Sequence, residues 1–598
     1  MGRKTKRKPD SAKAGKPGEA PRPAAPAPGP RWWRYLTRES LLIPLLLLFL
    51  VTVVLVNPRG DFPLNDDWLF AKSVQTLLKE HRLVRHPFAA PSAAPQILWG
   101  ALAAALFGFS FTALRATTLL VAALGCWAVA RCARACGLSR NAALLCGALV
   151  LCNPLFVNLS FTFMTDVPFF TLMAFSALFS LRALRSGRAR DVCLASAFGG
   201  AAFFLRQFGV CAGGAYALAA ALVSYQRRQR IPLRHCVAFL APWLAAGLLF
   251  LIWRAAQEPR APGHDFSAGR SWPFRIALCF SYAAVITTYM GLYVLPAAWA
   301  RASQLVTRRE RWRPAQWAGF GAFTALAASF LLFVHCRPLP VLYNILYDLG
   351  TGPLLLRYAQ YVYRGWAPVH IGDWWWAITL LAVAAGGVLV ADLIHRCRLR
   401  PGEPVSDAPP QADGPFAGGQ GWFLFFWAAL VTASSYNPFV SCAFDRYTLP
   451  VLIPAAVLCA GGLTPRLPKA GKALLGLTLA LFYLFSVAAA HDYLAWNRAR
   501  WAGLDYLRNE VGAPPERIDG GYEFNGMYTS DTFMELHDTR DFYERGDKEW
   551  WVLDDTYAVS FFLREDYEEI ARMPYFAWLG MERRYIFVLK RPGAPARL

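Results

Sequence analysis

The sequence predicts a polytopic α-helical membrane protein with a small extracytoplasmic α/β domain at its C-terminal end. Of its 598 residues, 56% are hydrophobic and only 17% are charged, which is too apolar for a soluble protein of this length. Lys and Arg occur in short clusters between long apolar runs. Residues 491–598 hold 20 acidic and 14 basic residues, a net charge of −6, against +29 for residues 1–490. The last hundred residues therefore face water.

The net charge of +23 does not indicate nucleic-acid binding, because the basic clusters follow the positive-inside pattern of membrane connectors. The thirteen cysteines show no CxxC pair and no His/Cys ligand spacing, so we predict buried small hydrophobes and no metal ligands. Cys336 and Cys442 lie near predicted outer membrane ends, where pairing is left open. Lone histidines in the loops show no metal spacing either.

Residues 1–38 contain eleven Lys or Arg against two acidic residues and include the Pro/Ala-rich run Pro21–Pro30. This composition predicts a disordered basic tail that keeps the N-terminus in the cytoplasm. The first span is expected at Leu41–Val56, and it is retained because no small-residue cleavage site follows it. Residues 57–115 then form the first outer loop.

Two helices are expected in that loop. Apolar residues after the acidic pair Asp66-Asp67 recur at helical spacing, which predicts an amphipathic helix on the outer membrane surface. The apolar segment Gln96–Gly108 is shorter than the roughly 20 residues that a crossing needs. If it crossed, the basic run Arg131–Arg134 would face outward, so we predict a juxtamembrane helix.

The remaining apolar runs bring the prediction to about thirteen spans within a transmembrane domain of residues 39–490. The runs lie at 116–131, 141–157, 168–184, 191–205, 208–224, 236–253, 276–299, 315–334, 374–394, 422–436, 448–463 and 473–490. Basic connectors then fall inside, and an odd number of spans puts residues 491–598 outside. In that domain we expect a helix at Trp496–Arg508 and strands at Trp550–Leu553 and Tyr585–Lys590.

Polar residues gather at the predicted outer ends of several spans, and these are the candidate site. They are Asp66 and Asp67 in the first loop, Asp166 before a span, Arg206 between two spans, and Arg446 before another span. A carboxylate beside an apolar surface accepts a proton from a hydroxyl, and arginine binds phosphate through two parallel hydrogen bonds. The pattern predicts a reaction between a lipid-linked phosphate donor and an acceptor hydroxyl.

Each element also has a plainer interpretation. The acidic pair fits a solvated loop, and Asp166, two residues before Pro168, fits a helix cap. Arg446 fits an interfacial anchor that extends outward, and Arg206 fits a solvated turn.

The order of motifs resembles a known family. An acidic pair after the first span, the stretch His86-Pro87-Phe88, a short apolar segment ending at Gly108, Leu114-Arg115 and a later Thr165-Asp166 resemble the GT-C membrane glycosyltransferases. The nearest group is glycosyltransferase family 39, which includes protein O-mannosyltransferases and bacterial aminoarabinose transferases. The resemblance covers residues 40–460 in layout and the first 170 in motifs. It implies a polyprenyl-phosphate sugar donor and an inverting transfer on the outer face.

Carried over by position, the resemblance makes Asp66 the general base. Asp67 stands where the family usually has Glu, and Asp166 matches an acid that shapes the site. The family's Glu-Lys-Pro-like stretch is not reproduced, because residues 90–96 read Ala-Pro-Ser-Ala-Ala-Pro-Gln. This removes an expected lysine near the carrier phosphate and one metal ligand. Arg206 or Arg446 is expected to supply the charge, and the need for a divalent metal is left open.

The leading prediction is a hexosyl- or pentosyltransferase that moves sugar from a polyprenyl phosphate to a lipid, protein or glycan hydroxyl. The alternative is a transporter or flippase of a lipid-linked or polar substrate, since many spans with embedded polar groups also fit a translocation path. A receptor or scaffold would leave the first-loop carboxylates without a task. The Ala/Arg-rich composition is typical of a bacterial inner membrane protein.

Overall fold

The computed structural model describes most of the chain after Ser40. The described residues are 2, 41–257, 271–308, 312–334, 336–342, 344–347, 350–357, 371–397, 416–435, 444–463, 467–536 and 550–593. Two compact units are distinguished, Met1–Ser40 and Leu41–Leu598, and all elements below belong to the second unit.

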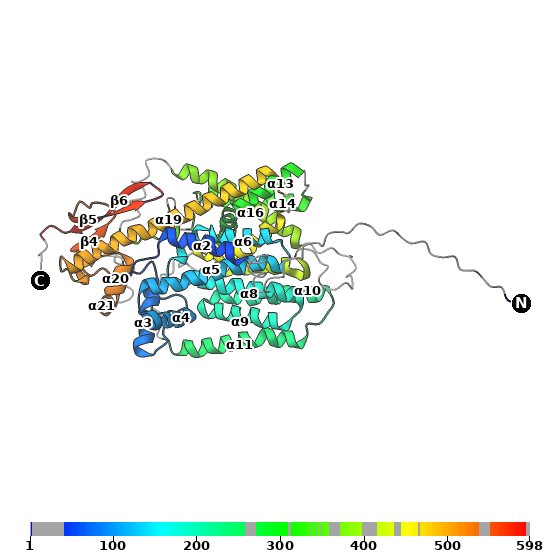
Figure 1. The fold of residues 1–598 in the computed structure, drawn as a ribbon, viewed down its shortest axis with the longest axis horizontal. Helices are drawn as coiled ribbons and strands as arrows, with labels where there is room; N and C mark the ends of the chain where they lie inside the picture. The colour runs from blue at the N-terminus through cyan, green and yellow to red at the C-terminus, as the bar shows by residue number, and fades with distance from the viewer. Residues whose placement is uncertain are drawn as a thin grey trace. The chain divides into compact units, whose positions relative to one another are not determined.

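The described chain up to residue 509 is mostly helical, drawn from blue to orange in Figure 1, and also contains a short antiparallel pair of strands, β1 (Leu346–Tyr347) and β2 (Gly350–Thr351). The bounds of the α-helices are α2 (Leu42–Val56), α3 (Asp67–Glu80), α4 (Ala94–Phe107), α5 (Phe111–Ala135), α6 (Arg140–Leu151), α7 (Pro154–Ser160), α8 (Asp166–Ser186), α9 (Ala189–Leu205), α10 (Val210–Gln226), α11 (Leu233–Ala255), α12 (Trp272–Tyr293), α13 (Leu295–Arg308), α14 (Pro314–Ser329), α16 (Ile371–Cys397), α17 (Gln420–Ser435), α18 (Leu449–Gly462) and α19 (Lys469–Asn509).

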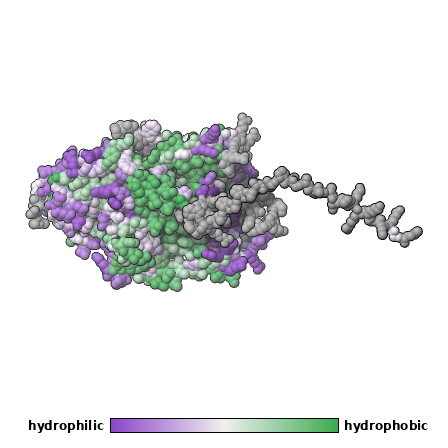
Figure 2. Space-filling model, in the orientation of Figure 1, coloured by the Kyte–Doolittle hydropathy of each residue, from purple (hydrophilic) through white to green (hydrophobic). Residues whose placement is uncertain are grey.

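These helices form the fold of a multi-pass membrane protein. By length and composition, 8 helices among the described residues can cross a membrane, or up to 9 if the pair α6 and α7, bent by 65°, is one span. Figure 2 shows hydrophobic residues in a broad band over the helices and hydrophilic residues over the end that carries the sheet. Since α2, α4 and α17 are shorter apolar helices, the predicted count of about thirteen spans is not confirmed.

Two predicted helix boundaries differ from the observed ones. The expected single span 276–299 is broken at Val294 into α12 and α13. Pro296 lacks the N–H that would continue the helical bond to the Leu292 carbonyl, and its ring crowds that carbonyl, which accounts for the break. Conversely, the expected span 473–490 and the helix 496–508 are one continuous helix, α19, of 41 residues. The net charge of the chain changes sign after residue 490, but the helix continues without a break across this point.

The C-terminal residues form the predicted α/β part on the extended end of α19. A four-stranded sheet has the order β3-β4-β6-β5, with β3 (Ile518–Asp519) parallel to β4 (Tyr557–Ser560). The pairs β4 with β6 (Glu582–Lys590) and β5 (Glu568–Ala577) with β6 are antiparallel. Two short helices, α20 (Tyr522–Tyr528) and α21 (Ser530–Leu536), follow β3.

The expected strand at Tyr585–Lys590 is confirmed as part of β6, but the one at Trp550–Leu553 is wrong. There the backbone turns, and both Trp550 and Trp551 have positive φ angles, of 60° and 58°. Trp551 is buried against Trp68 of α3, with ring centroids 5.1 Å apart. Aromatic packing therefore prevails over the strand propensity of this stretch.

The amphipathic face of α3 is covered by protein rather than by lipid. Trp68, Phe70 and Val74 are buried, and α3 packs against α4 and α20. Gly526 of α20 sits so close to Trp68 that an added Cβ would lie 2.4 Å from its ring. The expectation of a helix whose apolar face lies on the membrane surface is therefore wrong.

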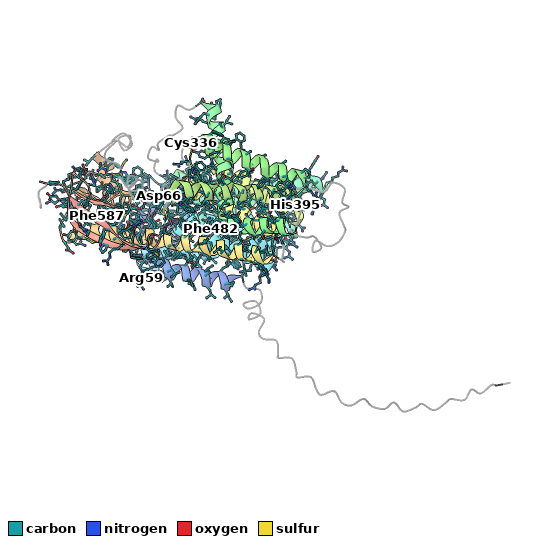
Figure 3. All side chains as sticks on the ribbon, turned by 90° about the horizontal axis from the view of Figure 1, so that it is seen from above. Arg59, Asp66, Cys336, His395, Phe482 and Phe587 are labelled. Atoms are coloured by element: carbon teal, nitrogen blue, oxygen red, sulfur yellow. The ribbon has the colours of Figure 1, made fainter. Side chains whose placement is uncertain are left out.

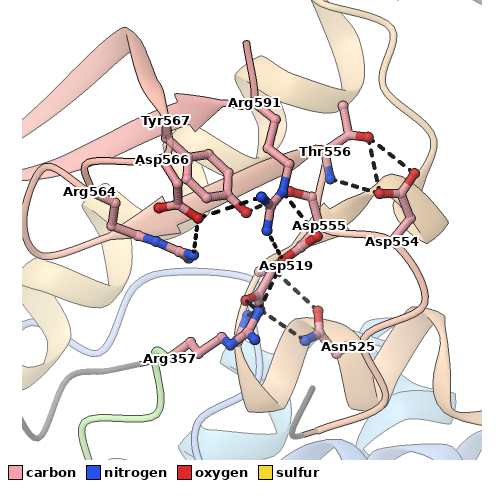
Figure 4. A network of polar contacts seen from close by, with 12 residues as sticks. Arg357, Asp519, Asn525, Asp554, Asp555, Thr556, Arg564, Asp566, Tyr567 and Arg591 are labelled. Carbon is pink, nitrogen blue, oxygen red and sulfur yellow. Dashed lines mark hydrogen bonds and ion pairs between the residues drawn. The ribbon is translucent and has the colours of Figure 1, made fainter. Parts of the chain in front are cut away.

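An ion-pair network joins the loop before α16 to the sheet (Figure 4). Arg357 contacts Asp555 at 3.1 Å and Asp519 at 3.6 Å, and Arg591 contacts Asp555 at 2.8 Å. The Arg357 and Asp519 side chains are 10% and 3% exposed, so the contact between the loop and β3 is shielded from solvent.

Candidate functional site

The first loop is fixed by a buried arginine. Arg115 of α5 is fully buried and donates hydrogen bonds to the carbonyls of Pro58, Gly60 and Phe62. A planar guanidinium with several donors suits three acceptors on one short segment. The chain from α2 to α3 is thereby held, and Asp66 immediately precedes α3.

Asp66 lies where the helical part meets the C-terminal part. In Figure 3 it is found between Phe482 of α19 and Phe587 of β6, with His395 of α16 at the far end. Its Oδ1 accepts a hydrogen bond from the Tyr522 hydroxyl at 2.8 Å, and its Oδ2 lies 3.3 Å from an Nη2 donor of Arg446. The side chain is 23% exposed. Asp66 is therefore not a solvated loop acid.

Three of the four other charged candidates, Arg446, Asp166 and Arg206, form a chain of ion pairs that leads away from Asp66. Arg446 Nε lies 3.9 Å from Asp166 Oδ1, and Arg206 Nη2 lies 3.0 Å from Asp166 Oδ2. Arg206 Nε also donates to Thr165 Oγ1 at 2.7 Å. The side chains of Arg446 and Arg206 are 7% and 10% exposed. Arg446 is therefore not an interfacial anchor that extends outward, and Arg206 does not lie in a solvated turn. The Asp166 side chain faces these two arginines and does not cap α8.

Arg446 keeps unused hydrogen-bond donors. Among the described residues, its Nε and Nη1 have no hydrogen-bond partner, although both atoms are buried. Burial alone lowers the pKa of this guanidinium, but the nearby carboxylates of Asp166 and Asp66 raise it well above its usual value. The cation is therefore permanent, and a buried cation with unmet donors is prepared for an anion.

A small cavity lies beside this arginine. It has a volume of about 10 Å³ and is lined by Asp166, Arg206, Arg446 and apolar residues of α8, α17 and α18. That volume holds about one water molecule. A larger apolar cavity of about 610 Å³, open on one side, is lined by residues of α12, α16, α17 and α18. Thr432 and Val451 in its lining directly follow in sequence Val431 and Pro450, which line the small cavity.

The 3-10 turn that carries Arg446 is held by its neighbour Asp445. This fully buried carboxylate accepts backbone hydrogen bonds from Ile345 at 3.0 Å and Leu346 at 2.6 Å. Burial raises the pKa of Asp445 to about 7, against the opposing effect of those amides. The contact ties the segment before α16 to the turn of Arg446, so the position of the guanidinium depends on both.

Asp67 does not join the other candidates. It is 1% exposed, and its Oδ1 accepts a hydrogen bond from the Phe163 amide at 2.8 Å while its Oδ2 accepts one from the Leu64 amide at 3.3 Å. Burial raises its pKa to about 8, with the amides acting in the opposite direction. The two carboxylates of the acidic pair thus have different surroundings, and Asp67 links the first loop to the segment before α8.

Tyr522 is a site residue that the sequence does not reveal. It begins α20, and a fully buried ion pair fixes its neighbour, with Arg500 Nη1 2.7 Å from Glu523 Oε2. Glu523 Oε1 also accepts a hydrogen bond from the backbone N–H of Asn65, the residue before Asp66, at 2.9 Å. Burial and the adjacent Asp66 carboxylate raise the Tyr522 pKa well above its usual value, so the phenol stays protonated and donates. The only sequence signal nearby is the turn at Gly520-Gly521.

No group of three or more His, Cys, Asp or Glu residues suited to a metal ion occurs within the described ranges. Cys336 is exposed, whereas Cys442 lies outside the described residues.

Comparison with known proteins bears on this site. Residues 92–253 match the family model described as dolichyl-phosphate-mannose-protein mannosyltransferase. The resemblance to GT-C membrane glycosyltransferases is therefore confirmed, and it covers the segment that carries Asp166 and Arg206. No curated protein matches the chain by sequence.

Two solved structures are similar to this chain over much of its length. ArnT from Cupriavidus metallidurans, in a crystal structure bound to undecaprenyl phosphate, has a TM-score of 0.37 and 13% identity, and the match covers 94% of this chain and 98% of that chain. The arabinosyltransferase EmbB from Mycobacterium smegmatis has a TM-score of 0.33 and 14% identity, over 77% of this chain and 41% of that chain. At these TM-scores neither structure bears on the details of the site.

Proposed function

We propose that the protein is an inverting membrane glycosyltransferase that moves a sugar from a polyprenyl-phosphate donor to an acceptor hydroxyl on the extracytoplasmic face. The observation that carries the proposal is the contact of Asp66 with Arg446, whose remaining donors are free among the described residues. One group thus combines a partly exposed carboxylate with a buried phosphate-binding cation. The family match supports sugar transfer, since its name describes a polyprenyl-phosphate sugar as donor.

In the proposed reaction, Asp66 takes the proton of the acceptor hydroxyl as the oxygen attacks the anomeric carbon. The bond from that carbon to the phosphate oxygen breaks, and the electron pair leaves with the polyprenyl phosphate. Attack from the side opposite the phosphate inverts the anomeric configuration. Arg446, supported by Arg206 and Asp166, stabilises the charge of the leaving phosphate.

The large apolar cavity supports the lipid nature of the donor. With a volume of about 610 Å³ and almost entirely apolar walls, it accepts part of a polyprenyl chain. Lining residues of the two cavities are sequence neighbours on α17 and α18, and we therefore expect a chain held there to present its phosphate to the Arg446 guanidinium.

The central experiment is transfer of labelled sugar from a panel of polyprenyl-phosphate sugars in membranes that contain wild type or Asp66→Asn. Loss of a general base lowers rates by about 10²–10⁴-fold, and we expect a loss of this size for Asp66→Asn with unchanged membrane insertion. Asp505→Asn, which alters an exposed carboxylate on α19, is the matched control and should transfer normally. Normal turnover by Asp66→Asn would exclude Asp66 as the base.

A transporter or flippase is the second candidate, favoured by the same apolar cavity in the membrane region. The two functions differ in whether a glycosidic bond is broken. If no donor gives transfer although the wild type is folded and inserted, movement of a fluorescent polyprenyl phosphate between bilayer leaflets becomes the deciding measurement. We further propose a bacterial inner membrane location, with the N-terminus cytoplasmic and residues 491–598 extracytoplasmic.

A further inference from the structure

The tip of the β5–β6 hairpin exposes an unusual set of apolar side chains. Phe576, Leu579 and Met581 are 52%, 39% and 82% exposed, and they stand at or next to the four-residue turn 578–581. Apolar residues at the end of a hairpin that belongs to a water-facing part need an apolar partner or carry a cost. The sheet itself does not need them, because its core is formed by residues such as Ile586 and Val588.

The tip is attached to α19 where that helix changes from apolar to polar. Residues 473–490 contain no charged side chain, and His491 and Asp492 follow directly. The Trp578 ring stacks on His491 with centroids 3.8 Å apart, and the amides of Trp578 and Leu579 donate to the Asp492 carboxylate at 2.7 and 3.0 Å. A span of α19 reaches the membrane surface near this point, so the tip stands at the level of the lipid headgroups.

The position of α2 also indicates that the hairpin tip lies at the membrane surface. Arg498 of α19 donates to the carbonyl of Asn57, the residue that ends α2, at 3.0 Å. Val54 of α2, one turn before that end, is 78% exposed, as expected for a side chain that faces lipid. The hairpin tip, which contacts α19 two turns before Arg498, lies no farther from the apolar band than the end of α2 does.

The groove beside the tip is lined by residue types that suit a membrane-water interface. A cavity of about 420 Å³ between α19 and β5 is lined by Arg498, His491, Trp578 and apolar side chains. Arg583 stands exposed at the start of β6. Tryptophan and arginine beside apolar residues are the combination that membrane-water interfaces favour.

We propose that the hairpin tip, residues 576–581, inserts into the lipid bilayer that holds the protein's own helices. Phe576, Leu579 and Met581 enter the upper acyl-chain region, Trp578 lies at the interface, and Arg498 and Arg583 face lipid phosphates. The tip thereby sets the orientation of the sheet relative to the membrane. This inference depends on the position of the hairpin alone and is independent of the proposed function.

The test uses the full-length protein in lipid nanodiscs with a fluorophore on a cysteine at Met581→Cys. Cys193 and Cys336, the exposed thiols among the described residues, are replaced by serine beforehand, together with Cys397 and Cys442. Lipids with a nitroxide high on the acyl chain should quench this fluorophore several-fold more than they quench one at Glu510→Cys. Glu510 is exposed in the same part of the protein but lies about 28 Å farther along α19 from His491, at 1.5 Å per residue.

Two results would overturn the proposal. Equal quenching at positions 581 and 510 would show that the tip stays in water. A fluorophore at 581 in an apolar setting that lipid nitroxides do not quench would show that another protein or a second copy covers the tip. Leu579→Cys provides a second labelling position, and only preparations that remain monodisperse are compared.

Discussion

Two adjacent carboxylates illustrate how residue-scale surroundings decide chemistry. The Asp66 carboxylate is partly exposed and meets a phenol and a guanidinium, whereas the Asp67 carboxylate is buried and accepts hydrogen bonds from two backbone amides. The first has side-chain partners that a substrate can replace. The second has partners that belong to the fold, so Asp67 is expected to act on stability rather than on transfer.

A pH-dependent stability follows for Asp67. Its folded-state pKa is raised to about 8 from an ordinary value of 3.8, mainly by burial, so between these values the folded state holds a proton that the unfolded state releases. The stabilisation from this group is full below about pH 4 and is lost as pH rises towards 8. Asp67→Asn cannot titrate and should flatten the fall of the thermal midpoint over this range, although the lost hydrogen bond lowers the midpoint itself. An unchanged slope in thermal scans of the variant against wild type would contradict the assignment.

The charged site residues could be predicted from the sequence, whereas their neutral partner Tyr522 could not. Asp66, Asp166, Arg206 and Arg446 are noticeable because charges are rare near apolar runs, and alternation of basic connectors puts all four on one side. Tyr522 lies 456 residues from Asp66 in a segment rich in aromatic and polar residues. No local pattern marks it, since its role depends on how the C-terminal part docks against the first loop.

At the scale of elements, α20 is positioned by α19 through one buried ion pair. Arg500 and Glu523 are both fully buried, and Arg500 also donates to the Gly520 carbonyl at 2.9 Å. Apolar runs predicted most helices of the membrane part, because bilayer thickness sets their length. Short elements such as α20 and the break at Val294 depend on single contacts or on one proline, which periodicity does not resolve.

Arg500→Met tests this ion pair. Removal of one partner leaves Glu523 as an uncompensated buried charge, which costs about 3–5 kcal/mol. We expect a lower thermal midpoint and faster proteolysis within residues 518–536. Lys72→Met is the control at the same junction: Lys72 pairs with Asp531, which is 75% exposed, and such pairs contribute about 1 kcal/mol or less. Equal stability of the two variants would exclude the ion pair as the main support of α20.

On the scale of the whole molecule, the described structure holds the site closed. The Tyr522 hydroxyl donates a hydrogen bond to the Asp66 carboxylate, and the cavity at Arg446 has room for about one water molecule. A sugar donor and an acceptor therefore do not fit between these groups together. The helical part supplies the charges and the C-terminal part supplies the cover. Substrate entry therefore requires α20 and α21 to separate from α3.

Reversible cross-linking of α3 to α21 tests this separation. Lys72 Nζ and Asp531 Oδ2 lie 2.9 Å apart at the rim of the junction, so cysteines at both positions can be joined by a short bis-methanethiosulfonate reagent. With Cys193 and Cys336 replaced by serine, the cross-linked Lys72→Cys/Asp531→Cys protein should lose transfer, and reduction should restore it. Each single variant treated in the same way controls for modification alone. If the cross-linked protein transferred sugar at the rate of the reduced form, the junction would not need to open, and substrates would have to reach Asp66 from the membrane side.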